Sequence, residues 1–419
     1  MSDDEWRNSI GIPWTTMAAL MLAVFTVSVG YGVVLPLLPD LIERLLGASI
    51  PLARVSRHTG LLTGVYTLAL FLFAPAWGKL SDRRGRRGVL LVGLFGFATT
   101  MLISSLVESL PAVYAERFLS GMFASAVTPV AGATIGDFAP TEQGRVRRLT
   151  LVSMAGIAGF LLGPMLGVGI TRIATTTYAR SLPAGPVAIP LAVVAILSFL
   201  VGLAVLFAVP SRKAVVRPAP AGNVVVHRDA PVVARLLALT FIVSAGVGVF
   251  EVGLVLRGKQ ELGLTPTQIA VMFSECSLVM FVMQAIVFSP RVKPEFTRWL
   301  IGPALAVMAG GLFLVLRASG FLLTLVVIGA VSASAGILSP VLTYWISAKA
   351  GSSQGWELGK QTAAASLGVT VGSGAGGLLF NLDGWRGAGF GLTAVLAVVG
   401  VGLTLGLPGR LVTTASVRR

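Results

Sequence analysis

The chain has 419 residues, of which 55% are hydrophobic and only 12% are charged. Soluble domains carry about 45–50% apolar and about 25% charged residues, so this composition excludes an ordinary soluble protein. The formal net charge of +15 is of a size that can indicate nucleic-acid binding. Here, however, the cations cluster in alternate gaps between apolar blocks, so we expect no nucleic-acid partner. The composition predicts a protein that crosses a lipid bilayer several times.

The apolar residues form twelve blocks of about 20 residues, a length that crosses about 30 Å of hydrocarbon as a helix. The predicted spans cover residues 14–39, 60–78, 89–107, 110–135, 146–171, 188–210, 235–256, 267–289, 298–317, 320–346, 360–381 and 386–408. We therefore expect an all-α membrane protein of twelve transmembrane helices. An even number of spans places both termini on one side of the membrane.

The lysine and arginine residues indicate which side that is. Of the 32 in the chain, 22 fall on the side that holds the termini. Positive loops stay in the cytoplasm. We therefore expect a multi-pass protein of the inner (plasma) membrane with both termini cytoplasmic.

The longest predicted cytoplasmic connection, residues 211–234, is rich in proline and charge and is typical of a linker. It would separate an N-terminal six-helix bundle (1–210) from a C-terminal one (235–419). Three small residues recur at a displacement of 211 residues: Pro129, Gly144 and Gly163 as Pro340, Gly355 and Gly374. Two repeated bundles around a central pathway are typical of a secondary transporter.

Three acidic residues, Glu116, Glu251 and Glu275, fall clearly within predicted spans. A charge at a helix centre costs at least about 2.5–3.5 kcal/mol, so each is a candidate for function. Helix geometry predicts that Glu251, Glu275 and Arg117 lie roughly 9–12 Å from the outer surface, in one layer of a cavity.

We interpret Glu251 and Glu275 as proton-coupling or substrate residues, because a buried carboxyl group can exchange a proton near neutral pH. Both histidines, His58 and His227, are predicted to lie in loops. The alternatives are that Glu251 is an interfacial acid and that Glu275 pairs with a polar neighbour. Glu116 and Arg117 are adjacent and so about 100° apart on a helix. We therefore expect only one to face the cavity, and favour Arg117, with Glu116 structural.

Other chemistry is not indicated. Gly372, Gly374 and Gly377 spell GxGxxG, but no strand precedes them and no acid follows at the spacing of a dinucleotide site. No phosphate-binding loop, metal-ligand spacing or nucleophile–base pattern appears. We expect no cofactor, no bound metal and no enzymatic activity.

The most charged stretch is GKLSDRRGRRG, residues 78–88, between two apolar blocks. It closely resembles the loop between helices 2 and 3 of the major facilitator superfamily. The matching residues are Gly78, Asp82, Arg83, Gly85, Arg86 and Arg87. The resemblance implies that the loop is a conformational latch. Its aspartate would engage a helix N-terminus of the opposite half, near 355–360, when the cytoplasmic side is closed.

Further segments of the first half resemble the same family. YGVVLPLLP resembles the end of helix 1, and ERFLSG carries the helix 4 pattern as Arg117 and Gly121. IGDFAPTEQGR, with Asp137 and Arg145, resembles the loop after helix 4. GFLLGPMLG resembles the helix 5 motif of the antiporters of this superfamily, as Gly159, Gly163, Pro164 and Gly167.

The resemblance implies two pseudo-symmetric six-helix bundles and drug–proton antiport by alternating access, with Arg117 and Glu251 at positions implicated in proton transfer or drug export. The chain departs from related exporters because span 10 carries no acid, and Glu275 is the candidate replacement. We expect a monomer that exports a small amphiphilic compound in exchange for protons. The alternatives are a metabolite importer or uniporter of the same fold and, from another class, a membrane receptor or binding module.

Overall fold

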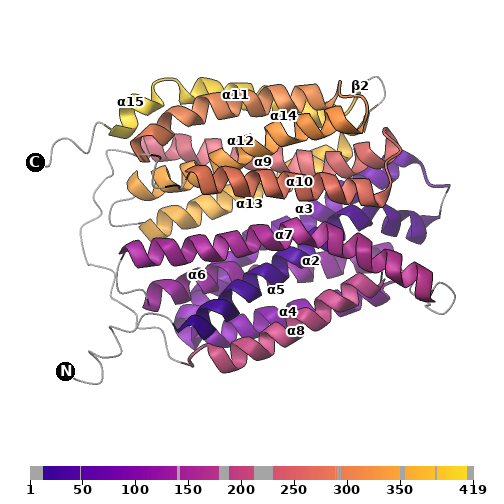
Figure 1. The fold of residues 1–419 in the computed structure, drawn as a ribbon, viewed down its shortest axis with the longest axis horizontal. Helices are drawn as coiled ribbons and strands as arrows, with labels where there is room; N and C mark the ends of the chain where they lie inside the picture. Colours follow the sequence, from indigo (N-terminus) through magenta and orange to yellow (C-terminus); the bar gives the residue numbers. More distant parts are fainter. Residues whose placement is uncertain are drawn as a thin grey trace, which may run out of the picture. The chain divides into compact units, whose positions relative to one another are not determined.

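The computed structural model describes residues 13–47, 49–138, 142–178, 188–211, 230–287, 289, 292, 294–349, 354–382 and 385–412. These residues lie almost entirely in long α-helices (Figure 1). The chain divides into two compact units: Met1–Leu46 with Leu68–Ala219, and Gly47–Thr67 with Pro220–Arg419. The prediction of an all-α membrane protein is confirmed.

The helices follow the predicted spans in order. Those of the N-terminal half are α2 (Trp14–Leu46), α3 (Leu52–Arg84), α4 (Arg86–Leu106), α5 (Leu110–Ala124), α6 (Val127–Phe138), α7 (Glu142–Tyr178) and α8 (Ala188–Ala208). Those of the C-terminal half are α9 (Ala230–Gln260), α10 (Pro266–Val287), the 3-10 turn η1 (Pro294–Phe296), α11 (Thr297–Val315), α12 (Phe321–Lys349), α13 (Gln354–Leu378), α14 (Ala388–Thr404) and α15 (Leu407–Val412). A two-residue hairpin, β1 (Asn381–Leu382) with β2 (Trp385–Arg386), joins α13 to α14.

Two differences from the predicted spans have simple causes. The span predicted over 110–135 is divided into α5 and α6, and the break includes Ser125. Proline at position 129 disrupts a helix there, since its ring collides with the carbonyl group four residues earlier. The helix α3 is longer at both ends than the span 60–78, because hydropathy marks only the apolar part of a helix. His58 therefore lies in α3 and not in a loop as predicted; His227 is outside the described residues.

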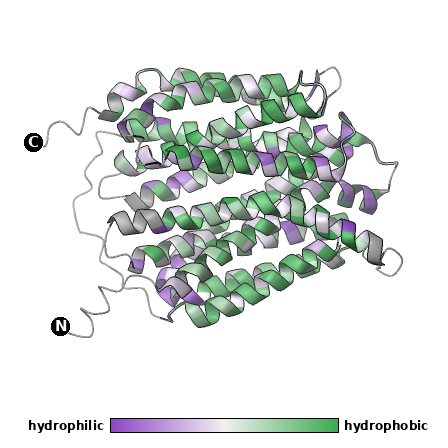
Figure 2. Ribbon diagram, viewed as in Figure 1, coloured by the Kyte–Doolittle hydropathy of each residue, from purple (hydrophilic) through white to green (hydrophobic). Residues whose placement is uncertain are grey.

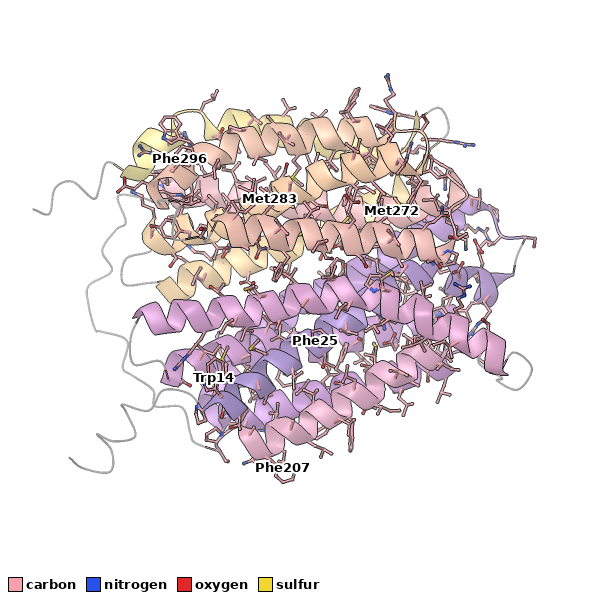
Figure 3. The ribbon with its side chains drawn as sticks, in the orientation of Figure 1. Trp14, Phe25, Phe207, Met272, Met283 and Phe296 are labelled. Carbon is pink, nitrogen blue, oxygen red and sulfur yellow. The ribbon has the colours of Figure 1, made fainter. Side chains whose placement is uncertain are left out.

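The helix surfaces suit a bilayer. Among the described residues, ten helices are long and apolar enough to cross a membrane, by length and composition. Figure 2 shows apolar residues along the helix bodies and polar residues concentrated towards their ends. Large apolar side chains are also exposed, including Phe207, whose side chain is 84% exposed at the end of α8 (Figure 3). Such side chains are stable next to lipid.

Within the first unit, α7 packs against α2 through glycines spaced four residues apart. The contacts pair Gly159, Gly163 and Gly167 of α7 with Phe25, Val29 and Val33 of α2. A Cβ atom on Gly163 would lie only 2.8 Å from the carbonyl oxygen of Val29. Small residues allow helix backbones to approach closely in a membrane. This motif therefore holds two helices together at backbone distance.

The second unit repeats this arrangement between α13 and α9. Here Gly368, Gly372 and Gly376 of α13 contact Phe241, Ala245 and Val249 of α9. The packing therefore matches Gly163 with Gly372. The sequence displacement of 211 residues, which matched Gly163 with Gly374, is wrong by two residues for this helix. A Cβ atom on Gly374 would meet no other atom within 4 Å.

Gly372 and Gly374 provide a matched pair for a stability measurement. We expect Gly372→Ala to destabilise the protein by about 1–3 kcal/mol, because the methyl group would collide with the Ala245 backbone. Gly374→Ala should be neutral or slightly stabilising, since alanine favours a helix by about 1 kcal/mol over glycine. Thermal unfolding in detergent measures both. Equal unfolding temperatures for the two variants would contradict the packing described here.

Candidate functional site

The Glu275 side chain lies between helices α10 and α12 of the second unit. It is partly exposed, and its Oε1 atom lies 3.0 Å from the place that a Cβ atom on Gly329 of α12 would occupy. The absence of a side chain at Gly329 makes room for the carboxyl group. Its Oε2 atom is buried and has no hydrogen-bond partner among the described residues. A carboxylate in such a place is costly unless it is protonated or reached by water.

The Glu251 side chain belongs to the neighbouring helix α9, which packs against both α10 and α12. It is partly exposed. Glu251 and Glu275 therefore belong to two helices of the second unit that contact each other. That their carboxyl groups share one layer stays a prediction. Among the residues that the structure describes, no cluster of histidine, cysteine and acidic side chains could hold a metal ion.

Glu116 and Arg117 form an ion pair in the first unit. The Nε and Nη2 atoms of Arg117 donate to the two carboxylate oxygens of Glu116, each at 2.7 Å. Both residues are only 3% exposed. Both residues lie in one buried stripe of α5. The expectation that Arg117 faces the cavity and Glu116 is structural stays a prediction. The stripe consists of Val113, Glu116, Arg117, Ser120, Gly121 and Ala124.

The charged segment 78–88 forms the end of α3 and the start of α4. Gly85 lies between these helices with φ = +93°, a conformation that favours glycine. Arg86 forms an ion pair with Asp82 at 2.5 Å, and its Nη1 atom donates to the hydroxyl of Ser81 at 2.7 Å. Its Nε atom donates to Asp137 of α6 at 2.9 Å. One arginine thus joins α3, α4 and α6.

Asp82 is the most accessible acid of this cluster, with 55% of its side chain exposed. Arg83 is exposed and Arg87 is partly exposed, and a Cβ atom on Gly78 would meet no atom within 4 Å. The predicted target of Asp82 lies at the start of α13, where Lys360 pairs with Glu357 at 2.7 Å. That target belongs to the other unit, so its engagement by Asp82 stays a prediction.

Two further motifs from the sequence are the glycine–proline motif of helix 5 and the loop after helix 4. Gly159, Gly163, Pro164 and Gly167 lie in α7, three of them in the glycine contacts with α2 and Pro164 against Gly32 of α2. Asp137 is the partner of Arg86, a contact that the sequence did not predict. The side chains of Pro140 and Arg145 lie outside the described residues.

The sequence also did not reveal a polar cluster in the second unit, which we call the α3–α13 clasp and define as Ser56, Gln260 and Asn381. The Asn381 amide donates to Ser56 Oγ at 2.7 Å and to Gln260 Oε1 at 3.0 Å. Gln260 Nε2 donates to Ser56 Oγ at 3.1 Å. The clasp thus joins α3, the last residue of α9 and strand β1, which follows α13, through uncharged side chains.

Further along α3, after Ser56, the backbones of α3 and α13 are in contact. A Cβ atom on Gly60 would lie 2.6 Å from the Cα atom of Gly377, and the hydroxyls of Thr67 and Thr370 are 3.0 Å apart. The segment HTGLLTGVYT, residues 58–67, has threonine at every fourth position (Thr59, Thr63 and Thr67) and glycine after the first two of them. This spacing is the signal that could have predicted this face. Uncharged polar residues hardly change the hydropathy of a span, so the sequence analysis did not identify this face of α3.

Comparisons with known proteins give one consistent result. The sequence model of the Major Facilitator Superfamily matches residues 20–356. Multidrug resistance protein 2 of Bacillus subtilis is 26% identical over 413 residues, which cover 95% of this chain and 96% of that protein. The class C tetracycline resistance protein of Escherichia coli is 37% identical over 152 residues, covering 36% of this chain and 37% of that protein.

Solved structures agree on the fold. The crystal structure of a D-xylose–proton symporter matches with a TM-score of 0.77 at 14% identity, covering 94% of this chain and 97% of that one. A human organic anion transporter matches with a TM-score of 0.69 at 19% identity, covering 93% and 99%. With the family model spanning most of the sequence and both folds matching over nearly the full length, the chain belongs to the major facilitator superfamily.

Proposed function

We propose that the protein exports a small amphiphilic compound or drug in exchange for protons, by alternating access between two six-helix bundles. The observation that carries this proposal is the full-length similarity to two Bacillus subtilis proteins named multidrug resistance proteins 1 and 2. The glycine–proline motif of α7, which resembles that of the antiporters, supports export over import. The protein would be a monomer in the bacterial plasma membrane, with both termini cytoplasmic.

Glu275 is the proposed proton-coupling residue, with Glu251 as the second carboxylate. One oxygen of Glu275 is buried without a hydrogen-bond partner in the described residues, so the residue gains little from staying ionised there. Such a group takes up a proton when it is buried and releases it when water reaches it. Release to the cytoplasm and uptake from outside would then alternate with drug binding.

Asp82 is the proposed latch. Arg86 holds the segment around it against Asp137 of α6, while the Asp82 carboxylate stays half exposed. A carboxylate near a helix N-terminus is stabilised by up to about 2 kcal/mol. Asp82 would use this stabilisation at the start of α13 when the cytoplasmic side is closed.

The α3–α13 clasp is proposed to act at the other end of α3. Residues 47–67 group with the second unit, whereas the rest of α3 groups with the first. In the predicted division into bundles 1–210 and 235–419, α3 and α13 belong to different bundles, so alternating access would separate the first half of α3 from α13 once in every cycle. The clasp consists of neutral hydrogen bonds, each worth about 0.5–1.5 kcal/mol, which permits repeated opening.

The coupling proposal predicts the behaviour of reconstituted vesicles that carry a pH gradient. Adding lipophilic cations, neutral antibiotics or sugars should reveal a substrate that evokes proton movement in the wild type. Glu275→Gln should reduce this movement by at least about tenfold, because an amide cannot carry the proton. Gly329→Ala should weaken it as well, since the added methyl group would press on Oε1 of Glu275.

The control variant is Glu295→Gln, an exposed acid in η1 that should behave as the wild type. Glu251→Gln tests the second carboxylate in the same assay. If substrate moves in the wild type without any proton movement, the protein is a uniporter and the exporter proposal fails. If protons move but neither glutamine variant changes this, coupling lies at other residues.

The latch proposal predicts that Asp82→Asn slows transport by about tenfold, since the neutral amide loses most of the interaction with a helix N-terminus. Membrane insertion should be unchanged, which surface expression measures. Glu108→Gln, an exposed acid between α4 and α5, is the control. Wild-type turnover of Asp82→Asn would rule out the latch.

The clasp proposal predicts an effect of cross-linking. In a Cys276→Ala background, Ser56→Cys with Asn381→Cys should be joined by a short reducible thiol cross-linker, because the replaced side chains are in contact. Transport should stop and should return after reduction. Each single cysteine variant is the control. Full transport by the cross-linked protein would show that α3 and α13 need not separate here.

A further inference from the structure

The Glu116–Arg117 pair is unusual because its members are neighbours in the sequence. Side chains at adjacent helix positions diverge by about 100°, so both must bend to meet. They meet through two parallel bonds of 2.7 Å that occupy both carboxylate oxygens. A two-point contact fixes the orientation of the planar guanidinium as well as its position. Glu116 therefore contributes to the orientation in which Arg117 is held.

The ion pair is buried inside the first unit. Glu116 and Arg117 lie in the centre of the buried stripe of α5, inside a helical region apolar enough to span a membrane. The ion pair has side-chain exposures of only 2% for Glu116 and 3% for Arg117. Ser120, one turn further on the same stripe, is also fully buried, and its hydroxyl has no hydrogen-bond partner in the described part of the chain. The stripe thus presents polar chemistry to the interior of the first unit.

We propose that Glu116 is a positioning residue for Arg117, and that the pair acts as one unit in proton coupling. This inference rests on the proposed proton-coupled export and on the resemblance that places Arg117 at a position implicated in proton transfer. In this proposal α5 carries a neutral ion pair and not an isolated cation, and the guanidinium group of Arg117 has one fixed direction. Arg117 would then serve as an oriented set of hydrogen-bond donors and not as a free charge that attracts anionic substrates.

The competing explanation is that Glu116 only neutralises Arg117 so that α5 can enter the membrane. Exchanging the two residues separates these explanations. The variant Glu116→Arg/Arg117→Glu keeps a neutral pair of adjacent residues but moves the guanidinium by about 100° around the helix. If only neutrality matters, the exchanged pair works as well as the natural one.

The experiment measures three quantities in reconstituted vesicles: the amount of folded protein, downhill substrate flux, and protons moved per substrate. We expect the exchanged variant to fold and to conduct substrate downhill, but to lose coupled proton movement by about tenfold to a hundredfold, the equivalent of a charged hydrogen bond. Glu116→Gln should lose coupling similarly, and Glu116→Asp should recover part of it. Glu108→Gln, at an exposed acid outside the stripe, is the control and should couple as the wild type.

Several outcomes would overturn the proposal. Wild-type coupling by the exchanged variant would show that the pair only neutralises itself. Wild-type coupling by Glu116→Gln, together with a defect in Arg117→Gln, would show that Arg117 acts alone. Should the single variants fail to fold, the neutral double variant Glu116→Gln/Arg117→Gln decides, because coupling by this protein would exclude any role for the pair.

Failure of the proposed function gives a different result. In that case the wild type itself moves no protons when substrate is added, whereas failure of the Glu116 proposal leaves wild-type coupling intact. Glu275→Gln is measured in parallel. If it loses proton movement while the Glu116 variants keep it, the proposed function stands and only the Glu116 proposal fails.

Discussion

The hydrocarbon interior of a bilayer offers no water to a charge or to a backbone amide, and most features of this structure follow from that constraint. Backbone groups are satisfied within helices, and helices associate where glycine lets their backbones touch. Charges are confined to helix ends unless they are paired or functional. The buried pair of Glu116 and Arg117 and the carboxyl group of Glu275 are two different responses to the same cost.

In each unit one long helix contacts another at backbone distance through glycines. In each unit, three glycines at four-residue steps hold one long helix on another, α7 on α2 and α13 on α9. Such contacts leave no space for a side chain to repack, so each helix pair should move as one body. The contacts between α3 and α13 differ, because they combine one backbone contact with neutral hydrogen bonds. Those bonds can be broken and remade at low cost.

The sequence predicted the fold well because hydropathy reports directly on burial in lipid. It predicted an all-α membrane protein and the order of its helices. It did not predict the break near Ser125, which depends on one proline, or the ends of α3, where the helix continues beyond its apolar part. Side-chain pairing was harder still. The contact of Arg86 with Asp137 and the meeting of Ser56 with Asn381 join segments 51 and 325 residues apart, and nothing local in the sequence specifies them.

The net charge moved in each transport cycle decides whether the membrane potential can drive export. One proton crossing a potential of 100 mV supplies about 2.3 kcal/mol, a little under two decades of concentration ratio. If the substrate is a monovalent cation exchanged for one proton, no net charge moves and only the pH difference drives export. The membrane potential contributes only if a second proton is carried, which requires a second group that changes its protonation. Glu251 of α9 and Glu275 of α10 are the two candidates for such groups. If their protonation is coupled, the two carboxyl groups exchange protons as a pair, and the number of protons per cycle then depends on whether the substrate separates them.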